Sequence, residues 1–442
     1  MKTFFIKNFG CQMNQYDAGR MDDLLRRSHG WHPVSTPEAA DLIIFNTCHI
    51  REKAEEKLFS ELGRLRKLVQ RRRPADGVIF AVGGCVGQAA GNDIFRRAPY
   101  VDLVFGPQNY HELPQMLEQL ARGRHQLQAT DAEAEDKFDH LPETGQSGPV
   151  ASVTIQEGCN RFCAYCVVPM TRGREWSRPA AEVLEEVTVC LDNGAVEVHL
   201  LGQNVNAYQA MNDARVTIDL SRLIAEVARM PRVQRIRFVT SHPVDMTDDL
   251  VQAFAEIPQL CPYMHLPIQS GSDAVLQAMR RGHGVEHYRQ WSEKLRSAHP
   301  DMALASDFIV GFPGETEEDF QATLALIEEV RFDHAYSFLF SPRPETPAAT
   351  MTNPVPAAVG RQRLAVLQDH LNRVQLENNR RQVGRKEEVL VEGESRQGHG
   401  MVMGRTRGHR RVNFIGGAEL LGQMVMVEIV EGLPNSLRGR LL

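Results

Sequence analysis

Short apolar runs alternate with longer amphipathic stretches along most of this chain, and this alternation limits the folds open to it. Helix-like stretches such as "MDDLLRRSHG" and residues 51–73 separate the runs in the first part of the chain. Buried strands that alternate with helices form parallel sheets covered on both faces. Residues 1–120 are therefore predicted to form a doubly wound parallel α/β domain. Its expected strands are residues 2–10, 40–48, 77–85 and 100–106.

A second alternating series begins at residue 151 and supplies six further strand candidates. Each is apolar at its start and becomes polar or glycine-rich at its end, as in "VEVHLLGQN" and "ALASDFIVGFPGE". In barrels of β/α units, the carboxyl ends of the strands carry the active site. Six units are fewer than the eight of a closed barrel of this kind. Residues 151–380 are therefore predicted to form an open, partial (β/α)6 barrel.

The last part of the chain has the spacing of a small β-barrel. After residue 380, five short strand-like runs are separated by glycine-rich turns, which is the pattern of an OB-like barrel. Residues 381–442 are predicted to form it, and the polar, acidic residues 121–150 are predicted to link the two α/β domains. Basic side chains gather around one turn of this barrel, where we predict contact with RNA. They are Arg405, Arg407, His409, Arg410 and Arg411.

Composition and charge exclude several classes of protein. Hydrophobic residues make up 42% and charged residues 24% of the 442 residues, as in globular proteins. No apolar run approaches the roughly 18 residues of a membrane span. The first residues have too short an apolar core for a signal peptide, so a cytoplasmic location is expected. With a net charge of −6, nucleic acid would have to be bound by a local basic patch.

Three cysteines follow the first strand of the second series in the pattern C-x3-C-x2-C: Cys159, Cys163 and Cys166. In a reducing compartment, thiols this close favour metal binding or redox chemistry over disulfides. A structural zinc site needs four ligands, and His199 is a possible fourth. An iron–sulfur cluster also takes thiolates. Three thiolates on a four-iron cluster leave one iron open for a substrate or cofactor.

A second trio of cysteines is spaced evenly through the N-terminal domain. Cys11, Cys48 and Cys85 follow one another at intervals of 37 residues, and each ends a predicted parallel strand. Such strand ends line one crevice of a doubly wound sheet, so the three thiols are predicted to converge on a second cluster. Lone cysteines are often small buried hydrophobic residues, which is how we interpret Cys190 and Cys261.

The C-x3-C-x2-C pattern, with an aromatic residue before its third cysteine, resembles the radical S-adenosylmethionine superfamily. In that superfamily three cysteines hold a [4Fe–4S] cluster whose open iron binds S-adenosylmethionine. The resemblance implies further contacts with this cofactor beside Cys166 and at the ends of the second, fourth and fifth barrel strands. The implied residues are Tyr165, Gln203, Asn204, Gln269, Ser270, Asp307, Ile309 and Gly311. Arg172 and Arg174 either neutralise a carboxylate or the cluster, or lie on the surface.

Nearly the whole chain resembles the methylthiotransferases. These combine a three-cysteine N-terminal domain, a radical S-adenosylmethionine core and a C-terminal TRAM barrel. The strings "GCQMNQYD", "NTCHIREKAEEK", "GCNRFCAYCVVPMTRG" and "PNSLRG" look like the branch that modifies tRNA. His49 departs from this pattern, because a small residue is expected there.

The resemblance implies a reaction with two [4Fe–4S] clusters, one on each cysteine trio, and two molecules of S-adenosylmethionine. One molecule donates a methyl group, and the other is the source of a 5′-deoxyadenosyl radical. The product carries a methylthio group on C2 of N6-isopentenyl(dimethylallyl)adenosine next to the anticodon of tRNA. The implied partners are the anticodon stem-loop, a sulfur source and an electron donor such as flavodoxin or ferredoxin. No feature demands more than a monomer.

Three alternatives stay open at this point. A ribosomal-protein methylthiotransferase, acting on an aspartate side chain, keeps the fold and changes the substrate. A methylthiotransferase for threonylcarbamoyladenosine in tRNA differs only in the modified base. An RNA-binding protein with structural zinc is not an enzyme at all. The basic turn and the strings around Cys11 and Cys48 favour tRNA over the ribosome.

Overall fold

The computed structural model describes residues 2–49, 54–72, 77–131, 133–212, 215–398 and 400–442. Its contacts divide the chain into two compact units. Unit 1 comprises Met1–Gln146, Gln156–Asn160 and Cys166–Arg178, and unit 2 comprises Ser147–Ile155, Arg161–Tyr165 and Pro179–Leu442. The segment with the C-x3-C-x2-C pattern therefore contributes residues to both units.

Unit 1 is built on one parallel sheet, as the alternating pattern predicts. The strands lie in the order β2-β1-β3-β4-β5-β6, and every described pair is parallel. Their bounds are β1 Thr3–Asn8, β2 His32–Pro33, β3 Leu42–Thr47, β4 Ile79–Gly84, β5 Leu103–Phe105 and β6 Leu127–Ala129. The strand order reverses at β1, which makes the crevice between β1 and β3 the topological switch point of the sheet. Ligands of open α/β sheets bind at such points.

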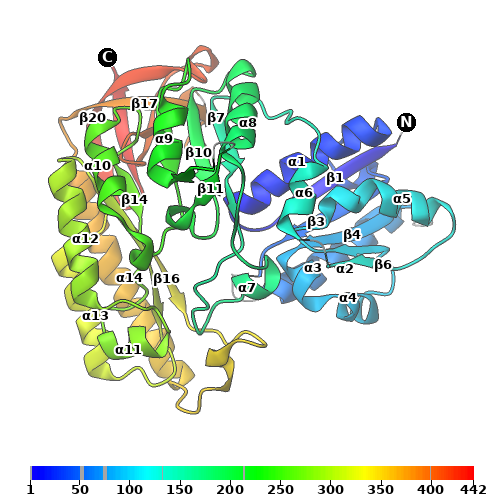
Figure 1. Cartoon of the computed structure of the whole chain (residues 1–442), viewed down its shortest axis with the longest axis horizontal. Helices are drawn as coiled ribbons and strands as arrows, with labels where there is room; N and C mark the ends of the chain where they lie inside the picture. Colours follow the sequence, from blue (N-terminus) through cyan, green and yellow to red (C-terminus); the bar gives the residue numbers. More distant parts are fainter. Residues whose placement is uncertain (1, 50–53, 73–76, 132, 213–214, 399) are drawn as a thin grey trace. The chain divides into compact units, whose positions relative to one another are not determined.

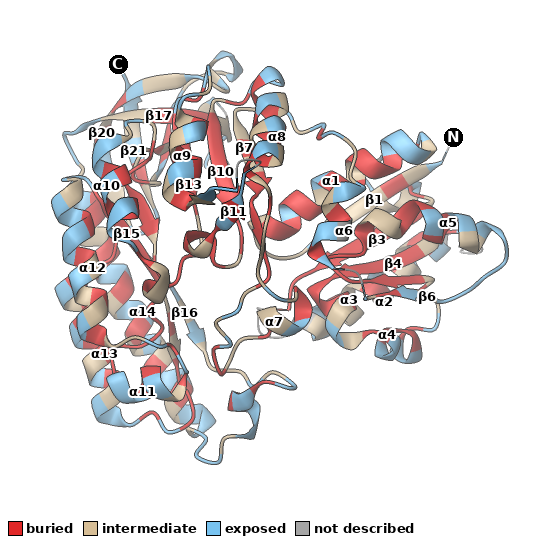
Figure 2. Ribbon diagram, in the orientation of Figure 1, coloured by how far each residue is buried: buried red, intermediate tan, exposed pale blue. Residues whose placement is uncertain are grey.

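Helices cover both faces of this sheet, so the doubly wound prediction is confirmed (Figure 1). Strand residues alternate between two cores: Ile43 and Phe45 face one, while Leu42 and Ile44 face the other. The first core is completed by α2 (Ala54–Arg72), α3 (Cys85–Ala90) and α4 (Asn92–Arg97), and the second by α1 (Gln12–His29) and α5 (Leu113–Ala121). The central strands are accordingly buried along most of their length (Figure 2).

The segment 121–150 differs from the linker that we expected. β6 adds a sixth strand to the sheet beside β5, and α6 (Ala134–Asp139) carries Lys137, which is completely buried. Unit 1 accordingly continues to Gln146. The acidic composition suggested a linker because β6 is only three residues long and α6 only six, too short to show a periodic pattern.

Unit 2 contains the six predicted parallel strands of a partial barrel. They form two three-stranded parallel sheets, β13-β10-β7 and β14-β15-β16, and a parallel bridge from Ile236 to Leu260 joins β13 to the residues before β14. The bounds are β7 Val150–Thr154, β10 Glu197–Leu201, β13 Arg235–Phe238, β14 Tyr263–His265, β15 Ala303–Val310 and β16 His334–Leu339. β7 and β16 form no described pair with each other, as expected of an open barrel.

Amphipathic helices alternate with these strands and share one large core with them. They are α8 Ala180–Asp192, α9 Leu220–Ala228, α10 Asp248–Glu256, α12 Val285–Ala298, α13 Glu317–Val330 and α14 Ala357–Arg380. The hairpin of β11 (Gln209–Met211) with β12 (Thr217–Asp219) and the short helix α11 (Asp273–Ala278) are additions that the strand–helix pattern did not predict.

The C-terminal part of unit 2 is a closed barrel of five strands, which confirms the OB-like prediction. The strand order is β17-β18-β19-β21-β20. The bounds are β17 Lys386–Glu394, β18 Met401–Thr406, β19 Arg411–Ile415, β20 Met424–Leu433 and β21 Ser436–Leu441. Valines of several strands, with Phe414, Ile429 and Leu437, fill its interior.

Candidate functional site

The N-terminal cysteine trio lies at the carboxyl ends of adjacent strands of unit 1. Cys11 follows β1 and caps α1, Cys48 directly follows β3, and Cys85 follows β4 and begins α3. Gly10 has a φ of +136°, and a Cβ there would lie 2.5 Å from the Cβ of Cys48. Only glycine therefore allows the turn before Cys11 to approach Cys48 so closely. The first two cysteines flank the switch point of the sheet.

The thiols of this trio differ in their ionisation. A hydrogen bond from Cys48 is the main reason why the pKa of Cys11 is lowered to about 6, despite the opposing effect of burial. Burial raises the pKa of Cys85. The Nδ2 of Asn14 donates to the carbonyl of Thr47 at 2.9 Å and ties the start of α1 to the end of β3.

The ligand chemistry of this trio can be compared with two kinds of metal site. A structural zinc ion takes four protein ligands, whereas a four-iron cluster binds each cysteine through a different iron. A set of soft thiol donors also fits iron–sulfur clusters by its chemistry.

A buried network of charged side chains lies within unit 1, and sequence reasoning missed most of it. Arg172, which follows α7 (Val168–Thr171), donates through Nη2 to Oδ2 of Asp17 at 2.7 Å and through Nη1 to Oε2 of Glu157 at 2.9 Å. Lys137 forms an ion pair with the other oxygen of Glu157. All four side chains are at most 4% exposed. The signal was present, because Asp17 ends one cysteine-containing string and Glu157 directly precedes another.

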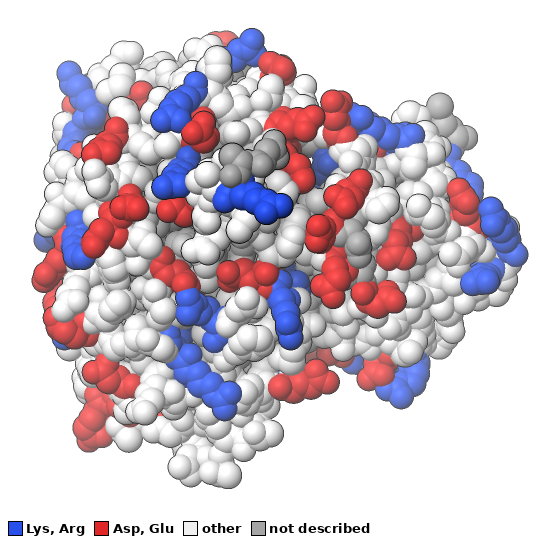
Figure 3. Space-filling model, in the orientation of Figure 1, with Lys and Arg blue, Asp and Glu red and all other residues white. Residues whose placement is uncertain are grey.

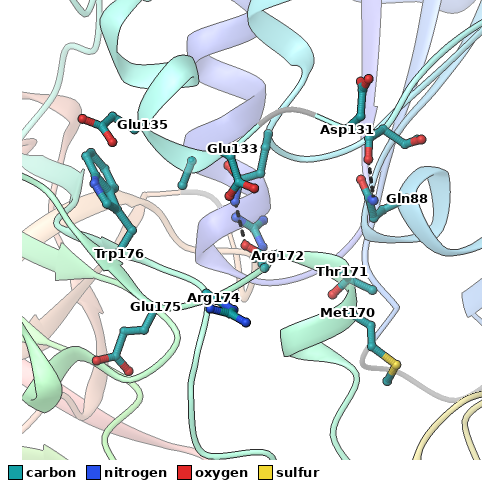
Figure 4. A pocket seen from close by; sticks show the side chains of 14 residues that line it. Gln88, Asp131, Glu133, Glu135, Met170, Thr171, Arg172, Arg174, Glu175 and Trp176 are labelled. Atoms are coloured by element: carbon teal, nitrogen blue, oxygen red, sulfur yellow. Dashed lines mark hydrogen bonds between the residues drawn. The ribbon is translucent and has the colours of Figure 1, made fainter.

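A cavity of about 370 Å³ lies beside Arg172 within unit 1 (Figure 4). Residues 170–176 line it from one side and residues of the segment 130–135 from the other. The side chains of Gln88 and Gln108 donate to the carbonyls of Thr130 and Arg172, at 2.8 Å and 3.0 Å. The segment that we expected to be a linker therefore packs beside the loop that follows the second cysteine trio.

The first part of the C-x3-C-x2-C segment belongs to unit 1. The N–H of Cys159 donates to the carbonyl of Gly173 at 3.3 Å. Gly158 has a φ of +73°, and a Cβ there would lie 2.0 Å from the carbonyl oxygen of Arg174. β8 (Gln156–Glu157) also pairs with β9 (Trp176–Ser177), so the two ends of the segment that carries Cys159 and Cys166 are held together.

Cys163 is buried in unit 2 and lies beside two nitrogen-bearing side chains. Nη1 of Arg281 donates to its sulfur at 3.3 Å, and Nε2 of His242 lies 4.0 Å away. Burial and the charge of Arg281 hold the pKa of His242 far below its usual range, so this imidazole is neutral. Nη1 of Arg281 also reaches the hydroxyl of Tyr165 at 3.5 Å. Neither Arg281 nor His242 was predicted from the sequence.

The residues expected after the second barrel strand lie at the carboxyl end of β10. Asn204 is buried and donates to Oδ2 of Asp245 at 2.9 Å. Asp245 also accepts from Nε of Arg161, inside the cysteine segment, at 2.7 Å. Asn204 thereby contributes to a polar network with Asp245 and Arg161, while Gln203 beside it is half-buried.

The residues expected near the fourth and fifth strands lie in and after β14 and β15. Gln269 has a φ of +82° and pairs with β15 through a parallel bridge to Phe308. Ser270 is buried, with its hydroxyl 3.3 Å from that of Thr323, and so supports the turn.

Asp307 and Ile309 are half-buried on β15, where Oδ1 of Asp307 lies 3.2 Å from Nε2 of His265. Gly311, with a φ of +74°, donates its N–H to Glu315 at 2.7 Å. All five residues thus lie at or beyond the carboxyl halves of their strands, but contact with S-adenosylmethionine stays a prediction.

The basic turn of the C-terminal barrel packs against the partial barrel within unit 2. Arg410 forms an ion pair with Asp333, and the ring of His409 lies 4.7 Å from that of Tyr263. Nη2 of Arg407 donates to the carbonyl of Leu260 at 3.3 Å. Arg411 is exposed. RNA contact by this turn stays a prediction.

The partial barrel holds the same turn through two buried arginines of β13. Arg237 donates to the carbonyls of Thr406 and Arg407, at 2.7 Å each, and Arg235 donates to that of Arg405 at 2.9 Å. Arg405 is half-buried, and its own side chain pairs with Glu392 at 3.1 Å. The two guanidinium groups of β13 thus satisfy backbone carbonyls of the turn.

Comparison with protein-family models divides the chain into three regions. Residues 3–106 match Uncharacterized protein family UPF0004, residues 153–327 match the Radical SAM superfamily, and residues 380–442 match the TRAM domain.

Solved structures of low sequence identity share the fold. The radical S-adenosylmethionine methyltransferase TsrM from Kitasatospora setae, solved with cobalamin and a [4Fe-4S] cluster, aligns with a TM-score of 0.57 and 14% identity. The alignment covers 79% of this chain and 74% of that one. The cobalamin-dependent enzyme OxsB gives a TM-score of 0.54 and 11% identity, over 84% and 56% of the two chains.

Curated relatives match over the full length. The tRNA-2-methylthio-N(6)-dimethylallyladenosine synthase of Magnetococcus marinus is 61% identical over 442 residues, which cover all of both chains. The protein of the same name from an Acidovorax species is 50% identical over all of this chain and 98% of its own. The chain therefore belongs to the tRNA-2-methylthio-N(6)-dimethylallyladenosine synthase family of radical S-adenosylmethionine enzymes.

Proposed function

We propose that this enzyme places a methylthio group on C2 of N6-dimethylallyladenosine next to the anticodon of tRNA. The observation that carries the proposal is identity of 61% and 50% with relatives of that name along the whole chain. Neither of these two relatives is named for the modification of a ribosomal aspartate or of threonylcarbamoyladenosine. Structural zinc in an RNA-binding protein is disfavoured by the radical S-adenosylmethionine match over residues 153–327.

Each cysteine trio has the donors for one [4Fe–4S] cluster. S-adenosylmethionine and one cluster follow from membership of the superfamily, and we propose Cys159, Cys163 and Cys166 as the ligands of that cluster. A second cluster at Cys11, Cys48 and Cys85 is our proposal, supported by their places at adjacent strand ends. When bound, these groups supply a carbon radical that can attack an unactivated aromatic C–H bond, and an iron site that can hold sulfur.

The side chains around Cys163 form a polar, partly buried environment at the carboxyl ends of the barrel strands. Arg281 offsets the charge of the thiolate that Cys163 would carry, and it is fixed by the carbonyl of Pro267 at 2.6 Å. The neutral imidazole of His242 adds no second charge there. The network of Asn204, Asp245 and Arg161 and the acceptors on Asp307 and Gln269 supply hydrogen-bonding groups for an amino acid and a ribose.

The remaining partners follow from the proposed reaction. The TRAM barrel is expected to contact the anticodon stem-loop, and flavodoxin or ferredoxin is expected to supply electrons to a monomeric, cytoplasmic enzyme. Among the described residues, no helix is both long and apolar enough to cross a membrane. The adenosine must leave the stacked loop to be modified, as bases do in enzymes that act on them.

Nucleoside mass spectrometry of bulk tRNA tests this function. A strain without its own methylthiotransferase is complemented with the wild-type chain, Cys11→Ala, Cys163→Ala, or Cys190→Ala as a matched control. Cys190 is buried in the core of unit 2, away from both trios in the sequence. We expect 2-methylthio-N6-dimethylallyladenosine with the wild type and Cys190→Ala, and only the unthiolated nucleoside with the other two. Methylthiolated threonylcarbamoyladenosine instead would contradict the proposal.

A further inference from the structure

Arg172 is a buried arginine of unit 1 that the proposed reaction does not use. It follows Cys166 by six residues in the chain, and its side chain is 4% exposed. Burying a guanidinium is costly unless charged partners surround it. Its neighbour Arg174 is exposed, so the burial of Arg172 is specific to that position.

Two carboxylates and a lysine balance this charge. Asp17 accepts from Nη2 at 2.7 Å, and Glu157 accepts from Nη1 at 2.9 Å and 3.3 Å. Lys137 pairs with Glu157 and is completely buried. Two positive and two negative groups therefore form a neutral set, held by α1, α6, β8 and the residue that follows α7.

The same guanidinium reaches the cysteine trio of unit 1. Arg172 directly follows α7, which packs against α3, the helix that begins at Cys85. A hydrogen bond joins the guanidinium of Arg172 to the thiol of Cys85. Asp17, the partner of Arg172, lies on α1, six residues after Cys11. Arg172 thus bonds to the helix that Cys11 caps and lies beside the helix that begins at Cys85.

We propose that Arg172 is a positioning residue for the iron–sulfur cluster of unit 1, with Asp17 and Glu157 fixing its guanidinium beside the trio. The physical reason is that three thiolates, two of them buried, add negative charge where little water can screen it, and a fixed cation stabilises them. The proposal rests on the second cluster of the proposed function. It assigns the loop after C-x3-C-x2-C a role in binding the cluster held by the other three cysteines.

The test isolates that cluster in the full-length chain. The background carries Cys159→Ala, Cys163→Ala and Cys166→Ala, so any iron retained after anaerobic reconstitution belongs to the trio of unit 1. If this background binds no iron, the second cluster of the proposed function is wrong. If it binds iron, the role of Arg172 is tested separately by substitutions added to it.

The informative variant changes Asp17→Asn and Arg172→Gln together. This pair keeps the buried set neutral, because Glu157 and Lys137 remain, and it removes the cation beside the thiols. We expect a chelator to remove iron about tenfold faster than from the parent background, in line with changes to groups that orient metal ligands. The reduction potential of the cluster should also become more negative, because the lost cation bonds directly to the thiol of Cys85, whereas the lost carboxylate of Asp17 acts on that thiol only through space.

The matched control changes Arg174→Gln and Glu175→Gln, the neighbouring pair, and should alter neither quantity. Arg172→Lys keeps the charge without the fork that holds two carboxylates, and should retain the potential while losing iron faster. If the double variant does not fold, the rate of iron loss from Arg172→Lys, compared with the parent background, tests the proposal instead. Unchanged chelation rates and potentials in a folded Arg172 variant, shown by circular dichroism, would overturn the proposal.

Discussion

Glu197 is a buried carboxylate of β10 that pairs with the two buried arginines of β13. Oε1 of Glu197 accepts from Nε of Arg237 at 2.8 Å and lies 2.6 Å from Nε2 of His199. Nη1 of Arg235 lies 3.6 Å from Oε2 of the same carboxylate. Both arginines are buried, although a strand in the interior of a barrel is normally apolar. Burial raises the pKa of Glu197, but Arg237, His199 and Arg235 outweigh it and hold that pKa far below its usual range.

We predict that Glu197→Gln destabilises unit 2 by about 3 kcal/mol at neutral pH, because the buried guanidinium of Arg237 loses the carboxylate it pairs with, whereas Arg235 keeps its ion pair with Glu388. Urea unfolding followed by fluorescence measures the difference. The matched control is Glu226→Gln in the exposed pair with Arg229, which should change stability by less than about 0.5 kcal/mol.

The same carboxylate gives a prediction for pH dependence. Because the folded-state pKa of Glu197 is depressed, its contribution is complete above the unfolded value of about 4.3 and is lost as pH falls towards the folded value. The difference in stability between the wild type and Glu197→Gln should therefore shrink as the pH falls below about 4. A constant difference between pH 7 and pH 3 would contradict this account.

At the scale of elements, the turn between β18 and β19 acts as a docking segment. Its backbone carbonyls accept from Arg235 and Arg237 at the start of the barrel strands, and Nε2 of His334 lies 3.3 Å from the carbonyl oxygen of Gly408. A Cβ on Gly408 would lie 3.6 Å from the Cβ of Ala303, so the turn packs closely on β15. A turn rich in arginine was expected to meet RNA, yet most of its polar atoms meet protein.

We predict that two neighbouring arginines of this turn differ in role. Arg410→Ala leaves Asp333 without its cation and should lower the thermal midpoint of unit 2 by a few degrees. Arg411→Ala removes an exposed side chain and should leave the midpoint unchanged. If Arg411 contacts a phosphate, its loss reduces the salt dependence of tRNA binding by a slope of about 1. Scanning fluorimetry measures the thermal midpoint, and binding titrations at several salt concentrations measure the salt dependence. A lower midpoint with Arg411→Ala but not with Arg410→Ala would contradict these roles.

At the scale of the whole molecule, the compact units do not follow the order of the chain. Unit 1 takes Gln156–Asn160 and Cys166–Arg178 from beyond its main segment, and these pieces supply Glu157 and Arg172. The network that holds Asp17 and Lys137 is therefore completed by residues that sequence analysis assigned to the barrel. The distribution of charged side chains does not mark the boundaries between the units, because basic and acidic side chains are interspersed on the face seen in Figure 3.

We predict that residues 1–146 alone do not form a stable domain, because Asp17 and Lys137 would lose their partners. The fragment should show little cooperative unfolding in urea. Replacing the stranded charges by apolar residues of similar size, Asp17→Leu with Lys137→Met, should recover part of the stability. The exposed pair Asp93→Leu with Arg96→Met is the control and should not recover it. A cooperative, stable wild-type fragment would contradict the role given to Arg172 and Glu157.

Much of the architecture could be read from the sequence. The alternation of apolar runs and amphipathic stretches predicted the parallel sheet, the six barrel strands and the five-stranded barrel, because the period of hydrophobic residues reflects local geometry. The two cysteine trios stood out for the same local reason, since each thiol of the N-terminal trio ends a strand. The resemblance carried by those strings was sufficient for the family.

Only the tertiary structure decided what the charged residues do. Nothing in the spacing of Arg172, Arg235, Arg237 or Arg410 shows that they are buried, because each has a partner 40 to 170 residues away in the chain. For the same reason, residues 121–150 were mistaken for a linker, although Lys137 is buried against Glu157. The period of hydrophobic residues identifies the buried face of one helix or strand. The environment of a charged side chain depends instead on residues from distant segments that pack beside it.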